Sequence, residues 1–293
     1  MKKKLICTIS ILVLAAALCS GCSTAPFKTT DSFASYYAKN KEEVGSDLKG
    51  MASDLAVLSD SEATNPNYQS NDYADLLIND STNEVLESYH CFDRLYPASI
   101  TKVMTALLTL EHGNMDDEIT LKHDINLTEN GAVISTLTKG DTVTVGQVFH
   151  TMLIKSANDC AVILAEYVAG SESKFIDMMN AKAKELGATH THFVNPNGLH
   201  NNDHYTTAYD LYLIFKEAVK HEEFVDTVSS KDYTMTYTTA KKTQINEYMQ
   251  STNYYLLNEF PVPEGVVMYG GKTGTTSMAK SCLILTTKNK KGE

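Results

Sequence analysis

Several common signatures of binding and catalysis are missing from this sequence. Its 293 residues carry a formal net charge of −11, which argues against nucleic acid as the main partner because phosphate binding requires a basic surface. If processing removes Cys7 and Cys19, the remaining cysteines form no CxxC pair, and the nine histidines form no HExxH motif, so we expect neither a metal site nor a dense disulfide framework. With 43% hydrophobic and 21% charged residues, the composition is nevertheless typical of a globular chain.

The N-terminus has the layout of an export signal. A lysine-rich start precedes an apolar run over residues 5–18, which is too short for a convincing membrane span. The following "LCSGCST" resembles a bacterial lipobox, although Cys19 stands where leucine is usual. We expect residues 1–22 to be a signal peptide with lipidation at Cys22, and simple cleavage nearby is the alternative. The mature protein is then extracytoplasmic, at the bacterial cell membrane or cell wall, with a lipid anchor as its contact with the membrane.

The rest of the chain divides into a polar segment and a folded domain. Residues 23–71 have weak apolar periodicity and predict a tether, so we expect the domain to cover residues 72–293. Two strand patterns around a polar turn occupy residues 73–89, and two more lie at 266–275 and 279–287. Between them, helical patterns end at Gly113 or begin near residues 144, 157, 171 and 207. Strands at both ends and a helical middle predict an α+β fold, in which an antiparallel sheet from distant segments packs against helices.

A serine and a lysine three residues apart open the first of these helices, in "PASITKV". Only this pair joins a helix start to a preceding hairpin, and residues three apart share one helix face. We therefore expect Ser99 to be a nucleophile whose proton goes to Lys102, with helix N–H groups nearby to stabilise negative charge. The other three S-x-x-K pairs are predicted to lie in the tether, at a helix cap and in a strand turn: Ser46/Lys49, Ser171/Lys174 and Ser277/Lys280.

A lysine can accept a proton near neutral pH only if burial or a second cation lowers its pKa. Lys272 in "GGKTG" offers that second charge, and the neighbouring glycines let a substrate backbone approach closely. "KSAND" adds Ser156 and Asn158 just before a buried helix, although S-x-N alone is equally typical of turn capping. The order S-x-x-K, S-x-N, K-T-G is far more specific than any single motif.

These three motifs identify a resemblance to the D-alanyl-D-alanine carboxypeptidases, the low-molecular-mass penicillin-binding proteins. "RLYPASITKVMTALLTLE", "THFVNPNGLHNNDHYTTAYDL" and "GGKTGTTSMAKSCLI" resemble that family's characteristic stretches, and the likeness runs from about Tyr73 to the end. It implies a penicillin-binding protein/β-lactamase-like fold with the site between sheet and helices. It also implies removal of the terminal D-alanine from peptidoglycan pentapeptide stems through an acyl-enzyme, covalent inhibition by β-lactam antibiotics, and no cofactor.

The resemblance also assigns a role to each motif residue. Ser99 is implied to be the acylated nucleophile and Lys102 its general base. Ser156 is implied to relay a proton, and Asn158 to position the peptide carbonyl. The remaining implied roles are carboxylate binding by Lys272 and Thr273, close strand approach at Gly274, and an oxyanion hole from the N–H groups of Ser99 and Thr275.

Two departures from the family and two alternative functions accompany this prediction. The family usually has glycine where this chain has Lys280, and similar proteins continue past Glu293 with another strand and a closing helix, which we expect the domain as given to lack. A serine β-lactamase is one alternative, but "FVNPNGLH" contains no acid that could serve as the deacylating glutamate. A non-catalytic peptidoglycan-binding lipoprotein is the other. A covalent penicillin label on Ser99 would exclude the non-catalytic function.

Overall fold

The structure is a computed structural model that describes residues 55–58, 73–127, 129 and 131–289. The expected signal peptide, Cys22, and most of the expected tether lie outside the described residues. The chain divides into two compact units, Met1–Leu55 and Ala56–Glu293, and the helices and strands below belong to the second. Among the described residues, no helix has both the length and the apolar character needed to cross a bilayer.

The predicted helical middle is present and contains the core. Helix α3 (Lys102–His112) is buried on every side up to Thr109, and it packs against α5 (Asn158–Ala169), which is buried over its first two turns. A helix that is apolar all round must lie inside a domain, so this pair forms its centre. The helices around the pair are α4 (Val145–Ile154), α6 (Glu172–Glu185), α7 (Ala208–Ala218) and α8 (Glu222–Ser229).

Side-chain caps fix where several of these helices begin. The Thr207 hydroxyl accepts a hydrogen bond of 3.0 Å from the Asp210 N–H, as the sequence predicted for the start of α7. The Ser171 hydroxyl accepts from the Lys174 N–H at the start of α6. The serine of this S-x-x-K pair therefore caps a helix, as predicted from its position after Gly170.

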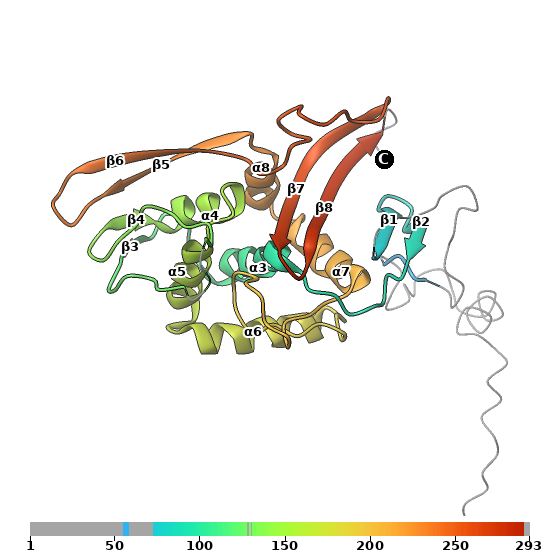
Figure 1. The fold of residues 1–293 in the computed structure, drawn as a ribbon, viewed down its shortest axis with the longest axis horizontal. Coiled ribbons are helices and arrows are strands. Elements are labelled where there is room, and N and C mark those ends of the chain that lie inside the picture. The colour runs from blue at the N-terminus through green and yellow to red at the C-terminus, as the bar shows by residue number, and fades with distance from the viewer. Residues whose placement is uncertain (1–54, 59–72, 128, 130, 290–293) are drawn as a thin grey trace, which may run out of the picture. The chain divides into compact units, whose positions relative to one another are not determined.

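The strands at the two ends of the domain form separate hairpins. Asp75–Asn79 (β1) pairs antiparallel with Glu84–Tyr89 (β2), and Val266–Thr276 (β7) pairs antiparallel with Lys280–Asn289 (β8). The expected joint sheet is incomplete, because no ladder links the two hairpins among the described residues. The connection runs instead through the 3-10 turn η1 (Ala98–Thr101), which packs against β7 and β8 (Figure 1). The mixed helical and antiparallel architecture is the expected α+β class.

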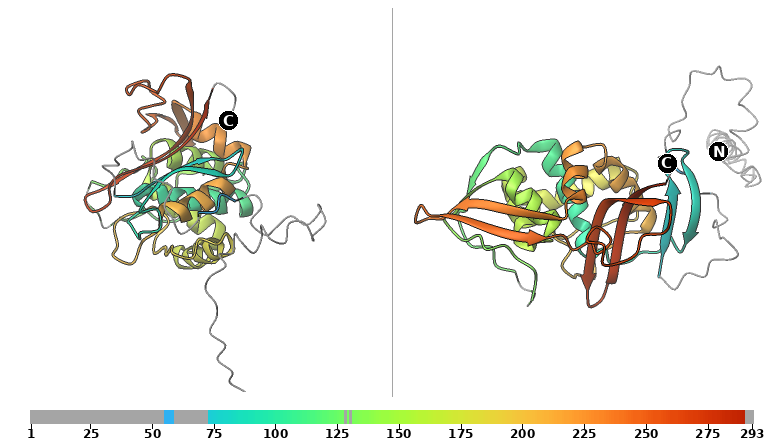
Figure 2. Two further views of the ribbon diagram at one scale, coloured as in Figure 1. Left: turned by 90° about the vertical axis from the view of Figure 1, so that its right-hand side faces the viewer. Right: turned by 90° about the horizontal axis from the view of Figure 1, so that it is seen from above.

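A further sheet occupies sequence in which we expected no strands. Its strand order is β3 (Glu118–Thr120), β4 (Thr142–Thr144), β5 (Asp232–Thr238) and β6 (Gln244–Gln250). β5 packs on α4, and the β5–β6 hairpin reaches past the helices in the views of Figures 1 and 2. The buried side chains Met235, Tyr237 and Met249 hold this hairpin to the core.

Part of the expected tether also contacts the folded unit. Ala56 is 0% exposed, its N–H donates to the Tyr212 hydroxyl at 3.0 Å, and its carbonyl accepts from the Tyr209 hydroxyl at 3.0 Å. Both tyrosines belong to α7. Ala56 is therefore packed against a helix of the domain, although it lies 16 residues before the expected start at residue 72.

Candidate active site

Ser99 lies on a tight turn between a proline and a buried lysine. The expected helix starts one turn late, because residues 98–101 form the 3-10 turn η1 and α3 begins only at Lys102. Ala98, directly before the serine, has a φ of 47°, a left-handed conformation that is uncommon for residues other than glycine. Such backbone conformations gather at functional sites, where the surrounding structure enforces them.

The Lys102 amine is enclosed by oxygen atoms. Its side chain is 0% exposed, and its Nζ lies 3.0 Å from Ser99 Oγ, 2.8 Å from Asn158 Oδ1 and 2.6 Å from the Asn197 carbonyl oxygen. Burial lowers the pKa of Lys102 well below its usual value, and repulsion from Lys272 lowers it further. No carboxylate is among these contacts, so the enclosure favours the neutral amine.

The three contacts also orient that neutral amine. It has two N–H bonds and one lone pair, and the Asn197 carbonyl can only accept. The amide nitrogen of Asn158 donates to the Val133 carbonyl at 3.0 Å, so its oxygen faces Lys102 and also accepts. These two acceptors take both N–H bonds, which leaves the lone pair for the Ser99 hydroxyl. The geometry can therefore remove a proton from Ser99.

A second buried lysine lies beside the second serine. Lys272 on β7 is 1% exposed, and its Nζ lies 2.9 Å from Ser156 Oγ and 2.8 Å from the Thr273 carbonyl oxygen. Burial lowers the pKa of Lys272 to about 7. Ser156 itself has a left-handed φ of 65° between α4 and α5. The two lysines thus contact different serines.

Strand β7 runs directly past the Ser99 turn. A Cβ atom on Gly274 would come within 2.9 Å of the Ser99 amide nitrogen, so only glycine fits without displacing backbone. Next to it, the Thr273 hydroxyl hydrogen-bonds the hydroxyl of Thr252, while Thr275 is exposed. The structure therefore brings together all three motifs, which lie far apart in the sequence.

Two residues at the site escaped the sequence analysis, Asn197 and His204. Asn197 acts through its main-chain carbonyl, which leaves no side-chain pattern. His204 is 2% exposed. Its pKa is lowered to about 3, mainly by burial, so its ring is neutral. Its Nδ1 accepts from the Val194 N–H at 3.1 Å, which places the proton on Nε2.

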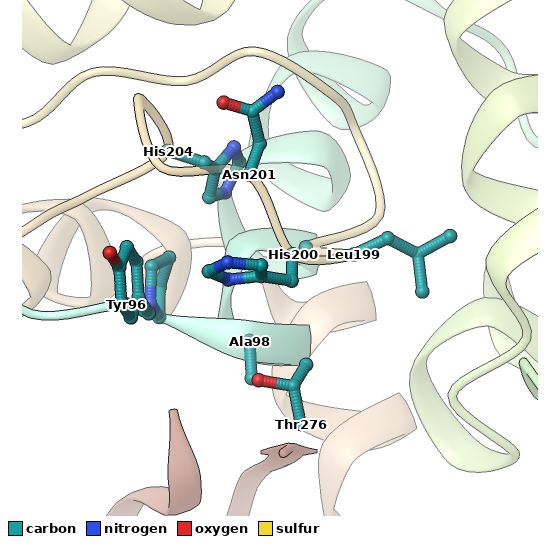
Figure 3. A pocket seen from close by; sticks show the side chains of 9 residues that line it. Tyr96, Ala98, Leu199, His200, Asn201, His204 and Thr276 are labelled. Carbon is teal, nitrogen blue, oxygen red and sulfur yellow. The ribbon is translucent and has the colours of Figure 1, made fainter. Parts of the chain in front are cut away.

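That proton continues a hydrogen-bond chain to the turn that carries Ser99. His204 Nε2 lies 2.8 Å from Thr101 Oγ1, which donates to the Ala98 carbonyl at 2.8 Å. Gly198 approaches the same carbonyl so closely that a Cβ would lie 1.9 Å from its oxygen. Figure 3 shows the shallow hollow between this loop and η1, lined in part by Tyr96, His200 and Thr276. The segment that includes Asn197 and His204 therefore supports the turn that carries Ser99.

The described residues contain no group of three or more His, Cys, Asp or Glu side chains that could hold a metal ion. The site contains a serine hydroxyl beside a lysine amine whose pKa burial lowers well below its usual value, and a second lysine whose pKa burial lowers to about 7. A hydroxyl nucleophile with an adjacent base is the arrangement of serine acyl-transfer enzymes.

Comparison with known proteins narrows this class to one family. The family model described as D-alanyl-D-alanine carboxypeptidase matches residues 60–293, and the chain belongs to that family. It is 37% identical over 218 residues to D-alanyl-D-alanine carboxypeptidase DacF of Bacillus subtilis, which covers 73% of this chain. It is 32% identical over 218 residues to D-alanyl-D-alanine carboxypeptidase DacC of Escherichia coli, which covers 71%.

Solved structures agree with the family assignment. The crystal structure of the Streptomyces K15 DD-transpeptidase superimposes with a TM-score of 0.64 at 29% sequence identity, over 72% of this chain and 82% of that one. The match to the curated relatives is less complete, since it spans 53% of DacF and 51% of DacC. This chain therefore spans about half the length of those relatives.

Proposed function

We propose that this protein is a penicillin-sensitive serine DD-carboxypeptidase that removes the terminal D-alanine from peptidoglycan pentapeptide stems. The observation that carries the proposal is the 3.0 Å contact between Ser99 Oγ and the amine of Lys102, whose pKa burial lowers. Family membership supplies the substrate class. The absence of an acid from "FVNPNGLH" gives the serine β-lactamase alternative no support.

In the proposed acylation step, neutral Lys102 takes the hydroxyl proton as Ser99 Oγ attacks the carbonyl carbon of the penultimate D-alanine. The oxyanion that forms accepts hydrogen bonds from the N–H groups of Ser99 and Thr275. When the C–N bond breaks, the proton that Lys102 took passes to the leaving amine of the terminal D-alanine, so Lys102 is neutral again. Water then hydrolyses the ester, with Lys102 again accepting a proton, and Ser99 is restored.

The remaining motif residues bind substrate or move protons in this proposal. Ser156 relays the proton from Lys102 to the leaving amine, while the Lys272 amine donates a hydrogen bond to the Ser156 hydroxyl. Asn158 positions the peptide carbonyl with the second N–H bond of its amide. Binding of the substrate carboxylate falls to Lys272 and Thr273, while Gly274 lets β7 lie against the nucleophile turn.

We also propose an extracytoplasmic location. The N-terminal pattern supports export, and a substrate class in the cell wall requires it. Lipidation of Cys22, which becomes the N-terminus once the residues before it are removed, would then hold the enzyme at the membrane close to its substrate, with a polar tether between the anchor and the catalytic domain.

Mass spectrometry after penicillin exposure tests the proposed nucleophile. The unaltered protein is expected to gain the mass of one penicillin, and Ser99→Ala to gain none, because penicillin acylates the nucleophilic serine. Ser171→Ala is the matched control, since its serine also belongs to an S-x-x-K pair but caps a helix, and it should still be labelled. Release of D-alanine from a pentapeptide is the second measurement. An adduct that survives in Ser99→Ala would refute the assignment.

A further inference from the structure

The loop over residues 133–137, at the edge of the site, is hydrogen-bonded directly to Asn158. The Val133 carbonyl accepts hydrogen bonds from the Asn158 main-chain N–H at 2.8 Å and from its side-chain Nδ2 at 3.0 Å. The same side chain contacts Lys102, which contacts Ser99. An unbroken series of hydrogen bonds therefore leads from the nucleophile to this loop, and Val133 lies directly beyond Asn158.

Two carboxylates hold the loop in place. Buried Asp159 accepts from the N–H of Ser135 at 2.9 Å and from its hydroxyl at 2.5 Å. Glu247 on β6 accepts from the Thr136 N–H at 3.1 Å and pairs with Lys155 at 2.5 Å. Hydrogen bonds to charged groups are stronger than those between neutral groups, so these residues fix the position of the loop.

The held loop presents apolar side chains to solvent. Val133 is 45% exposed and Ile134 is 51% exposed, whereas Ser135 and Leu137 immediately after them are buried. Single exposed hydrophobic residues need no explanation, but two adjacent ones on an anchored loop beside a catalytic asparagine are a surface available to a ligand.

We propose that Val133 and Ile134 form an apolar shelf that binds the aliphatic side chain of the stem-peptide residue preceding the two D-alanines. The inference rests on the proposed function, since it assumes an acyl donor at Ser99. A donor whose carbonyl carbon is at Ser99 and whose backbone passes Asn158 brings its preceding residue to Val133. The shelf thus sets which stem peptides are preferred, through the side chain that a D-alanine dipeptide lacks.

The test compares two acetylated tripeptides that differ only in that side chain, one with norleucine and one with glycine before D-Ala-D-Ala. In Val133→Thr/Ile134→Thr, which keeps the branched shapes but adds hydroxyls, the kcat/KM ratio of the norleucine to the glycine peptide should fall about 10-fold, as expected for methylene contacts in an apolar site. The matched control Leu77→Thr/Leu86→Thr alters exposed apolar residues of the β1–β2 hairpin and should leave the ratio unchanged.

An unchanged ratio of the two kcat/KM values would overturn the shelf. If both kcat/KM values fell by the same factor, the loop would only position Asn158. Binding of the two peptides to Ser99→Ala, with and without the loop substitutions, gives a measurement that needs no turnover. If the unaltered protein hydrolyses neither peptide, the proposed function fails. The shelf is then tested by binding alone, and it is supported if the loop substitutions abolish the preference of Ser99→Ala for the norleucine peptide.

Discussion

The two buried lysines differ in what their surroundings allow. Lys102 contacts two obligatory acceptors and the Ser99 hydroxyl, so its neutral form has a defined lone pair. Lys272 contacts a hydroxyl and one carbonyl, and its pKa of about 7 lets it carry charge near neutrality. In the proposed mechanism, burial thus supports two tasks with one residue type, a base at Lys102 and a cation for an anionic substrate at Lys272.

This difference predicts the pH dependence of kcat/KM, which titrates groups of the free enzyme. Lys102 must be neutral to act as a base, so activity rises with pH through its lowered pKa. Lys272 must be charged to bind the carboxylate, so activity falls as pH rises above about 7. In Lys272→Arg the falling limb should move beyond pH of about 9, because a guanidinium keeps its proton.

A substrate without the carboxylate is the control for this profile. A peptide that ends in D-alanine amide should show no falling limb near pH 7 with the unaltered protein, since Lys272 then has no anion to bind. Stopped-time assays of product release from pH 5 to 9.5 would measure both curves. A falling limb that is the same for acid and amide peptides would show that another group titrates.

The site residues that act through side chains in a motif could be predicted from the sequence. The order of S-x-x-K, S-x-N and K-T-G singled out Ser99 and Lys272, and the structure places their motifs side by side. Asn197 could not be predicted, because its contribution is a carbonyl that every residue has, and neither could His204, whose neutral ring is two hydrogen bonds away from the Ala98 carbonyl. These roles depend on tertiary packing that no spacing reveals.

At the scale of elements, the β7–β8 turn explains why glycine at position 280 would suit the fold. Thr276 pairs with Lys280 across a three-residue loop, and Lys280 has a φ of 59°. A hairpin of this kind needs a left-handed residue where the chain re-enters the strand, and glycine adopts that conformation without a Cβ clash. The lysine in this chain holds the same conformation at a cost.

Lys280→Gly is therefore expected to raise the free energy of unfolding by about 1 kcal/mol, the cost of a left-handed conformation for a residue with a Cβ. Thermal unfolding would measure this as an increase in Tm of about 3 °C for a domain of this size. Lys280→Ala is the control, because it removes the same charge but keeps the Cβ. An equal gain in both variants would attribute the effect to charge rather than to backbone strain.

The β5–β6 hairpin shows where element prediction from the sequence fails. Threonines alternate with Tyr233, Met235 and Tyr237 in β5, so the apolar face is narrow, and the opposite face is wholly polar. Strand propensity of this kind depends on what the strand packs against. Here the partner is α4, which lies about 80 residues earlier in the chain, and its contribution is invisible in a local window.

For the whole molecule, strands at both ends of the domain could be predicted from the sequence, but whether the two ends pair with each other could not. Pairing within each terminal hairpin is local and was predicted, because a short turn joins the strands. Pairing between the hairpins would join segments nearly 200 residues apart in the sequence. The described residues contain no ladder of this kind. Contacts of η1 with β7 and β8 connect the two ends instead, at the point where Ser99 lies.

The contacts of Ala56 with α7 indicate that the folded domain begins no later than Ala56. A form that begins at Leu55 should be more stable than one that begins at Ser59, because only the longer form keeps the two hydrogen bonds to Tyr209 and Tyr212. Their loss should lower the free energy of unfolding by about 1–3 kcal/mol and Tm by about 5 °C. Substituting both tyrosines by phenylalanine should lower the Tm of the longer form and leave that of the shorter form nearly unchanged. Equal Tm values for the two unsubstituted forms would show instead that residues 55–58 add nothing to the stability of the domain, which would then begin later in the chain.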